Sequence, residues 1–196
     1  MKPISLNKVL ILFLLIIVAL APSAQAGINP KKIEKLIAPS FDQFAPTGLA
    51  VAVVKDGDII YSGAFGYKDA AEKTPLTTKS LFSIASCSKA FTAAAIGLLV
   101  QEGKVRWDDK VIDYIPGFQL DDACITASLT IEDLLCHRSG LGTFFGDLLW
   151  YGTDYTNEEI IRRMRYLPIK QGFRTQFGYQ NNMYMVAGEV IRKVTG

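Results

Sequence analysis

Ser86-Cys87-Ser88-Lys89 is the stretch that decides the fold of this chain. It places a serine hydroxyl and a lysine amine three residues apart, at the start of an apolar segment that continues to Val100. Residues three apart share one face of a helix, so Lys89 can lie beside the Ser86 hydroxyl. A serine becomes a useful nucleophile when a neighbouring base takes its proton. The stretch therefore predicts a helix over about residues 86–102 with a nucleophile–base pair at its N-terminal end.

The residues after Lys89 predict a buried helix, because they are apolar on every side. Burial removes water from the charged form of a lysine, which lowers its pKa and makes the free amine available as a base. The first helical turn also directs backbone N–H groups toward Ser86, and Gly103 is expected to end the helix. The alternative is a core helix whose lysine extends to solvent, since a lone Ser-x-x-Lys pair is a common pattern.

The N-terminal residues predict an export signal. Lys2 and Lys8 form a positively charged N-terminal region, and an apolar run follows over residues 9–21. Ala24-Gln25-Ala26 is a small-x-small cleavage site. The run is shorter than the ~20 residues that span a bilayer, although an uncleaved membrane anchor is the alternative. We therefore expect a secretory signal peptide over residues 1–26, cleavage near Ala26, no stable membrane span afterwards, and a periplasmic or secreted protein.

Charge and cysteine content exclude several classes of function. The chain has 21 Lys and Arg against 19 Asp and Glu, and the two lysines of the predicted signal account for the excess. The remaining chain is balanced, so we expect no nucleic-acid partner, which needs a basic surface. Cys87, Cys124 and Cys136 could form one disulfide but no disulfide framework, and Cys87 is expected to be a small buried packing residue. With one histidine and no Cys/His cluster, neither a metal site nor another cofactor is expected.

Hydrophobic periodicity predicts strands near the front of the chain and helices after them. We expect a helix over residues 30–44, a hairpin of strands 49–54 and 59–65 joined by an Asp-Gly turn, and a polar loop over 66–80. Capping boxes formed by Thr130 with Asp133 and by Thr156 with Glu159 mark two later helix starts. A lone hairpin is marginal in water, so the sheet is expected to be incomplete. The later helices are expected at residues 107–115, 131–137, 158–166 and 182–195.

Two later segments complete the pattern that Ser86-x-x-Lys89 begins. His137-Arg138-Ser139-Gly140-Leu141 runs from a helix end into a glycine turn, and Tyr179-Gln180-Asn181 opens the last helix. In this order the three motifs resemble those of the serine β-lactamase and penicillin-binding-protein superfamily, most closely its class C-like β-lactamase-related serine hydrolases. The resemblance covers residues from about 30 to 196. It implies an α/β (α+β) fold of the β-lactamase/transpeptidase type, with an antiparallel sheet flanked by helices and a helical subdomain.

The resemblance also implies roles for individual residues. Ser86 would be the nucleophile that becomes acylated, and its backbone N–H would form half of an oxyanion hole. Lys89 and Tyr179 are the two candidates for the catalytic base, and Asn181 would bind the substrate amide and orient Lys89. His137 is interpreted as a turn residue, because no Asp or Glu stands at triad spacing. Aromatic residues that could line the substrate cleft or fill the core are Trp107, Phe144, Phe145 and Trp150.

Departures from the family pattern limit the expected activity. The strand with Lys-Thr-Gly or His-x-Gly is not found before Gly196, so residues 27–196 are expected to be the N-terminal part of a truncated hydrolase domain. The glutamine that class C β-lactamases place after the Gly-Leu turn is missing, which favours an esterase or peptidase. The hypothesis is an exported serine hydrolase that forms an acyl-enzyme with a β-lactam, a cell-wall D-Ala peptide or a small ester. The alternative is a non-catalytic peptidoglycan-binding or scaffold protein.

Overall fold

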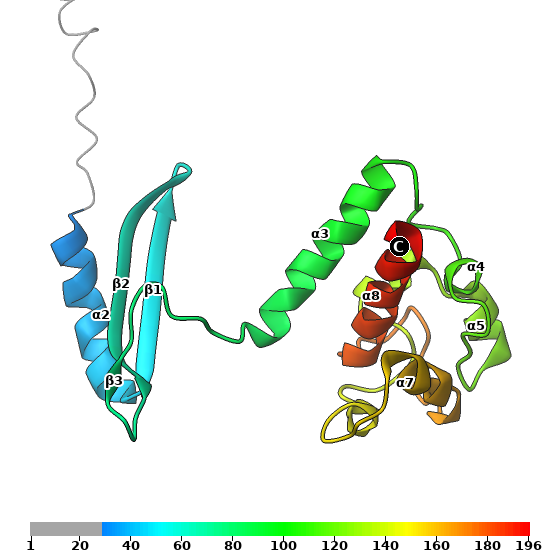
Figure 1. Ribbon diagram of the computed structural model, residues 1–196. Coiled ribbons are helices and arrows are strands. Elements are labelled where there is room, and N and C mark those ends of the chain that lie inside the picture. The colour runs from blue at the N-terminus through cyan, green and yellow to red at the C-terminus, as the bar shows by residue number, and fades with distance from the viewer. Residues whose placement is uncertain (1–28) are drawn as a thin grey trace, which may run out of the picture. The chain divides into compact units, whose positions relative to one another are not determined.

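The computed structural model describes residues 29–196, which belong to two compact units divided after Phe82 (Figure 1). The first unit carries the sheet, and the second, residues 83–196, is helical. The predicted signal peptide lies outside the described residues. Between residues 29 and 196, no helix has both the length and the apolar character needed to cross a membrane.

The first unit contains a helix and a three-stranded antiparallel sheet of order β1-β2-β3. Helix α2 (Pro30–Phe44) begins where the Asn29 side chain accepts a hydrogen bond from the Lys31 backbone N–H. The expected helix and hairpin are confirmed, and the antiparallel sheet flanked by a helix agrees with the predicted fold class. The strands are β1 (Gly48–Lys55), β2 (Asp58–Asp69) and β3 (Thr74–Pro75).

The turn between β1 and β2 has the backbone that its sequence predicts. Asp56 and Gly57 both have positive φ, 52° and 89°, as a two-residue turn between right-twisted strands requires. The predicted polar loop over residues 66–80 is wrong in part. Strand β2 continues to Asp69, and Tyr67 pairs with Pro75 of β3, so the chain reverses within this segment and adds a third strand.

In the second unit, the predicted apolar helix is present but begins later than expected. Ser86 lies in a 3-10 turn, η1 (Ala85–Cys87), and α3 (Ser88–Gln101) follows it. Gly103 follows the helix with φ 69°, which confirms its predicted place as the left-handed residue after the C-terminus.

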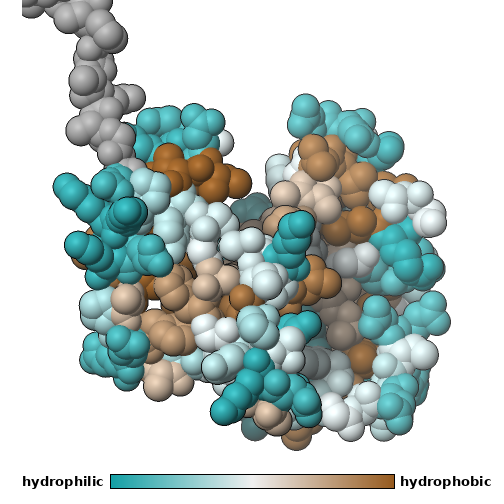
Figure 2. Space-filling view, turned by 60° about the vertical axis from the view of Figure 1, so that its left-hand side comes forward, coloured by the Kyte–Doolittle hydropathy of each residue, from teal (hydrophilic) through white to brown (hydrophobic). Residues whose placement is uncertain are grey.

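The prediction that α3 is buried on all sides is wrong. Only Ile96 and Leu99 are buried, and Cys87 is exposed. Helix α3 packs against α8 (Asn181–Thr195) along one side, and its other apolar side chains, such as Phe91 at 70% exposure, reach the surface. Figure 2 shows hydrophobic residues among hydrophilic ones on the molecular surface. The apolar sequence predicts a helix whose sides are all buried, whereas in the structure the second unit covers one side of α3.

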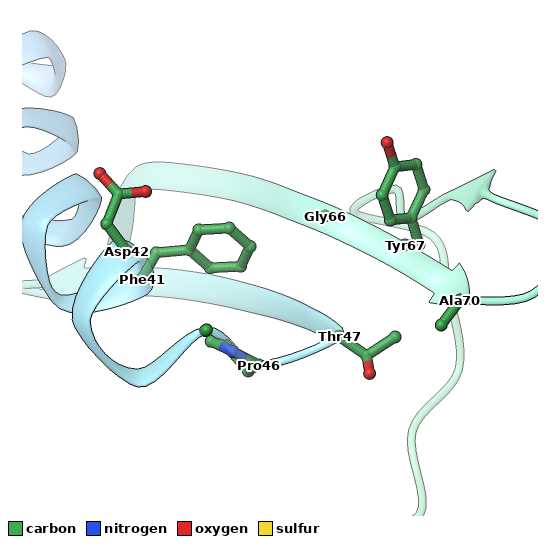
Figure 3. Close-up of a pocket in the computed structure, with 8 residues that line it drawn as sticks. Phe41, Asp42, Pro46, Thr47, Gly66, Tyr67 and Ala70 are labelled. Carbon is green, nitrogen blue, oxygen red and sulfur yellow. The ribbon is translucent and has the colours of Figure 1, made fainter.

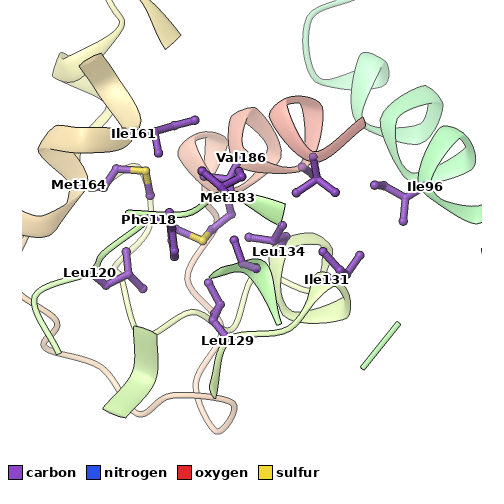
Figure 4. Close-up of a cluster of buried hydrophobic side chains, with 14 of the residues drawn as sticks. Ile96, Phe118, Leu120, Leu129, Ile131, Leu134, Ile161, Met164, Met183 and Val186 are labelled. Carbon is purple, nitrogen blue, oxygen red and sulfur yellow. The ribbon is translucent and has the colours of Figure 1, made fainter. Parts of the chain in front are cut away.

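The hydrophobic core of the second unit lies between α3, α8 and a set of short helices. The capping box of Thr130 with Asp133 is present, and the Thr156 side chain accepts from the Glu159 backbone N–H as expected. The helices predicted at residues 107–115, 131–137 and 158–166 are shorter in the structure, whereas the one predicted at 182–195 is found as α8 with one more residue at its start. Helix α5 was not predicted. The short elements are α4 (Val111–Tyr114), α5 (Ala123–Ser128), α6 (Ile131–Leu135), η2 (Asp147–Leu149), α7 (Asn157–Arg163) and η3 (Met164–Tyr166). Buried core side chains in Figure 4 include Ile96, Phe118, Leu120, Leu129, Ile131, Leu134, Ile161, Met164, Met183 and Val186.

A charged contact fastens α6 to the segment that leads into α8. The Asp133 carboxylate, only 4% exposed, accepts hydrogen bonds from Arg174 Nη2 at 2.7 Å and from the Thr130 hydroxyl at 2.8 Å. Arg174 Nη2 also donates to the Ser128 carbonyl. Burial alone would raise the pKa of Asp133, but the hydrogen bonds from Arg174 and Thr130 outweigh it and lower that pKa. The contact holds the 170–178 segment in place.

We predict that Arg174→Ala destabilises the protein by about 2–3 kcal/mol, because a buried carboxylate loses its cation. The figure is below the range for fully buried pairs, since the Arg174 side chain is 43% exposed. Urea denaturation of the full-length polypeptide would measure the change. Arg106→Ala, which breaks an exposed pair with Asp108, is the matched control and should leave the unfolding free energy nearly unchanged.

The same contact gives a pH dependence of known sign. Because the pKa of Asp133 is lowered on folding, its contribution to stability is present above the ordinary carboxyl value of about 3.9 and disappears as pH falls through the lower folded value. Arg174→Ala should therefore differ most from the parent near neutral pH and converge with it in acid. Equal destabilisation of Arg174→Ala at pH 7 and pH 2 would contradict this assignment.

Candidate active site

Three of the four predicted site residues line one pocket of the second unit. The pocket measures about 320 Å³ and contains Ser86, Lys89 and Asn181. Ser86 is exposed and Lys89 is half-buried, so the prediction of a fully buried lysine is wrong. Tyr179, the fourth residue, reaches Ser86 with its hydroxyl group. The remaining lining residues are Ala85, Trp150 and Met185.

The Ser86 hydroxyl lies within hydrogen-bonding distance of both candidate bases. Tyr179 Oη donates to Ser86 Oγ at 2.7 Å, and Lys89 Nζ donates to the same oxygen at 3.3 Å. Lys89 comes from the first turn of α3, one turn after Ser86, as the spacing predicts. Two groups that can take or give a proton therefore converge on one nucleophile.

Lys89 connects these groups to Asn181 at the start of α8. Its ammonium donates to Asn181 Oδ1 at 2.6 Å and lies 4.8 Å from the centre of the Tyr179 ring. The positive charge stabilises a phenolate more than a phenol. Lys89 is accordingly the main cause, and the hydrogen bond with Ser86 the second, that lowers the pKa of Tyr179 from its ordinary value.

The backbone before α8 is held by neighbouring loops, which places Tyr179. The Gly178 N–H donates to the His137 carbonyl at 2.8 Å, and the Tyr179 N–H donates to the Thr143 hydroxyl at 3.1 Å. A side chain at Gly178 would collide with the Leu141 backbone carbonyl, so this position requires glycine.

His137 supports the Tyr179 ring and does not contact Ser86. The two rings stack with their centres 4.5 Å apart, and His137 Nδ1 accepts a hydrogen bond from the Gln180 N–H at 3.0 Å. An accepting nitrogen belongs to the neutral imidazole. Burial, and then the charge of Lys89, lower the pKa of His137. The geometry agrees with the interpretation of His137 as a structural residue.

A larger pocket of about 590 Å³ lies in the first unit, beside the end of α2 and β2 (Figure 3). Its lining contains the Asp42 carboxylate and the Tyr67 phenol, but no serine, lysine or histidine. The Thr47 hydroxyl also lines it, but this pocket lacks the serine–lysine pair of the second unit. Across the described residues, 29–196, no group of three or more His, Cys, Asp or Glu side chains is placed to hold a metal ion.

Comparison with known proteins agrees with the motif order. A family model described as Beta-lactamase matches residues 33–196. The chain belongs to the beta-lactamase family.

Several proteins resemble the chain over most of its length. Unguisins hydrolase ungD of Aspergillus violaceofuscus is 35% identical over 76% of the chain, and penicillin-binding protein 4* of Bacillus subtilis is 35% identical over 79%. The matches span 27% and 33% of these two relatives, so the chain corresponds to about a third of their length or less. The structure of D-amino acid amidase from Ochrobactrum anthropi, complexed with L-phenylalanine amide, superposes with a TM-score of 0.66 at 29% identity, over 83% of the chain and 44% of the amidase. These likenesses confirm the predicted superfamily and fold class.

Sequence reasoning missed one polar residue of this site. Asp147, the first residue of η2, accepts a hydrogen bond from Asn181 Nδ2 at 2.8 Å. Of the aromatic candidates, Trp150 lines the Ser86 pocket and the Phe144 ring packs edge-on against Tyr179. An aspartate in a loop without periodicity has no sequence signal of its own. The only sequence feature that places Asp147 near the site is its position in the loop after the Gly-Leu turn, five residues after Gly142.

We predict that Lys89→Met raises the pKa of Tyr179, because the variant removes the cation that lowers it. NMR titration of the full-length polypeptide with 13Cζ-labelled tyrosine would measure this pKa, and the signal that disappears in Tyr179→Phe identifies the residue. Lys104→Met, which removes an exposed lysine paired with Glu102, is the matched control. An unchanged Tyr179 titration in Lys89→Met would contradict the proposed influence of Lys89.

Proposed function

We propose that the polypeptide containing this chain is an exported serine hydrolase that forms an acyl-enzyme on Ser86 with an amide or ester substrate. The observation that carries the proposal is the convergence of Tyr179 Oη and Lys89 Nζ on Ser86 Oγ, at 2.7 and 3.3 Å. Membership of the beta-lactamase family supports serine hydrolase chemistry. Export is supported by the sequence pattern of residues 1–26.

In the proposed reaction, Tyr179 is the proton acceptor and Lys89 keeps its phenolate available. The phenolate takes the proton of Ser86 as Oγ forms a bond to the substrate carbonyl carbon, and the carbonyl oxygen gains the negative charge. When the tetrahedral intermediate collapses, the bond to the leaving nitrogen or oxygen breaks and Tyr179 returns the proton to the leaving group. Water then hydrolyses the ester on Ser86 by the same steps in reverse order. The shorter distance and the lowered pKa favour Tyr179 over Lys89 as the base.

The substrate class follows from the chemistry and from the relatives. Asn181 lines the pocket beside Ser86, and we propose that its carboxamide hydrogen-bonds the amide or ester group of the substrate. Candidates are a cell-wall D-Ala peptide, a β-lactam or a small ester. The names of the similar proteins, a hydrolase, a penicillin-binding protein and a D-amino acid amidase, support an acyl group bound to nitrogen or oxygen.

We predict that the full-length polypeptide is labelled covalently on Ser86 by a fluorescent penicillin or a fluorophosphonate. The Oγ–acyl or Oγ–phosphorus bond would add the mass of the opened penicillin, or of the fluorophosphonate less fluoride, to the intact protein. Ser86→Ala should abolish the adduct, whereas Ser88→Ala, an exposed serine one position before Lys89, should label like the parent.

The labelling experiment also separates the two classes of function. Folded protein that gives no adduct with either probe, or equal labelling of Ser86→Ala, would overturn the hydrolase proposal. A folded and unreactive protein that sediments with purified peptidoglycan would instead support the binding or scaffold alternative.

A further inference from the structure

The carboxylate of Asp147 contacts the end of the Asn181 carboxamide that Lys89 does not use. Asn181 Oδ1 accepts from Lys89 Nζ at 2.6 Å, and Asn181 Nδ2 donates to Asp147 Oδ2 at 2.8 Å. We propose that Asp147 is a positioning residue, which fixes the orientation of the Asn181 side chain and thereby the place of the Lys89 ammonium beside Ser86. The inference rests on the function proposed above and adds a residue to its machinery.

The two ends of the Asn181 carboxamide differ in their hydrogen-bonding chemistry. A carboxamide has an acceptor oxygen and a donor nitrogen of nearly the same shape, so an unsupported asparagine can present either end to a neighbour. With the reversed orientation, Nδ2 would face the Lys89 ammonium and Oδ1 would face the Asp147 carboxylate. One contact would then place two donors together, and the other would place two acceptors together. Lys89 and Asp147, which have opposite charges, therefore select the same orientation of Asn181.

Asp147 is itself held in place by its own loop. Its Oδ1 accepts from Trp150 Nε1 at 3.2 Å, and its backbone carbonyl accepts from the Trp150 and Tyr151 N–H groups at 3.1 and 2.9 Å. Both carboxylate oxygens thus have a donor. Because the Asp147 side chain is already held by these hydrogen bonds, it loses little conformational entropy when it binds Asn181.

The loop that carries Asp147 is also tied to the segment that carries Tyr179. The Phe144 N–H donates to the Tyr179 carbonyl at 2.8 Å, and Gln180 Nε2 donates to the Phe145 carbonyl at 3.2 Å. Gln180 is fully buried. Hydrogen bonds therefore connect Asp147, Tyr179 and Asn181 to one another, and these residues meet α3 at Lys89 and Ser86.

The charge of Asp147 has a second effect, opposite in sign to that of Lys89. Lys89 is the main cause that lowers the pKa of Tyr179, whereas the negative charge of Asp147 raises it. Removing Asp147 should therefore move the acid limb of the labelling rate to lower pH while the maximal rate falls. General damage to the fold would lower the rate without this shift.

A double-mutant cycle on the full-length polypeptide tests whether Asp147 acts through Asn181. We expect Asp147→Ala to slow fluorophosphonate labelling of Ser86 by about tenfold or more, because a small displacement of a catalytic group has an effect of this size. In an Asn181→Ala background, the same substitution should change the maximal rate, measured above the acid limb, by less than twofold. Asp154→Ala, which removes an exposed aspartate of the following segment, is the matched control and should label like the parent.

A second measurement reports on the contact without any reaction. In 15N-labelled protein, the side-chain amide signal of Asn181, identified by its absence from Asn181→Ala, should show hydrogen exchange at least several times faster in Asp147→Ala and unchanged in Asp154→Ala.

The inference is overturned if Asp147→Ala labels within twofold of the parent, if it slows labelling equally in the Asn181→Ala background, or if the Asn181 amide exchanges as before. A parent protein that fails to label overturns the proposed function instead, and the exchange measurement then decides the role of Asp147 in holding Asn181.

Discussion

The hydrogen bond from Lys89 to Asn181 joins the N-terminal ends of two helices whose residues lie 92 positions apart in the sequence. Packing within the second unit helps to keep these two ends together. Packing of α3 against α8 sets the distance between the helices, and the core below them, with Ile96 on one helix and Met183 on the other, prevents sliding. Because protein interiors are close-packed, a shift of either helix would disturb many contacts at once.

One cation serves several partners at this junction. The Lys89 ammonium donates to Ser86 and Asn181 and lies against the rings of Tyr179 and Tyr184, at 4.8 and 5.4 Å from their centres. It stabilises negative charge on the phenol, and its contact with the amide leaves it little freedom to move. The His137 ring stacks on Tyr179 and, because its pKa is lowered by burial and by Lys89, adds no competing positive charge. Lys89 is therefore the main influence on the pKa of Tyr179, and the negative charge of Asp147 opposes it.

The sequence predicts this site well where residues are separated by fixed local spacing. Ser86 and Lys89 lie one helical turn apart, and Tyr179 and Asn181 open a strongly periodic helix, so local geometry already limits where their side chains point. Asp147 could not be found in this way, because its approach to Asn181 depends on a loop with left-handed backbone at Phe144 and Gly146. The two-residue strand β3 and the short helix α5 are too brief to show a period. The burial of α3 was misjudged because apolarity does not say which face a neighbour covers.

In the proposed reaction, Tyr179 and Lys89 handle the proton of Ser86, and all three residues belong to one compact unit, residues 83–196. They lie at the ends of its elements rather than in its core. The residues proposed to react with the substrate are thereby separate from the loops that would select it. Loops that do not contact these groups can change length and composition, while α3, α8, their shared core and the 143–150 loop preserve the distances around Ser86. Divergence in such a family can proceed by altering the entrance and leaving the reactive centre intact. A hydrolase, a penicillin-binding protein and an amidase can then share one ancestral scaffold.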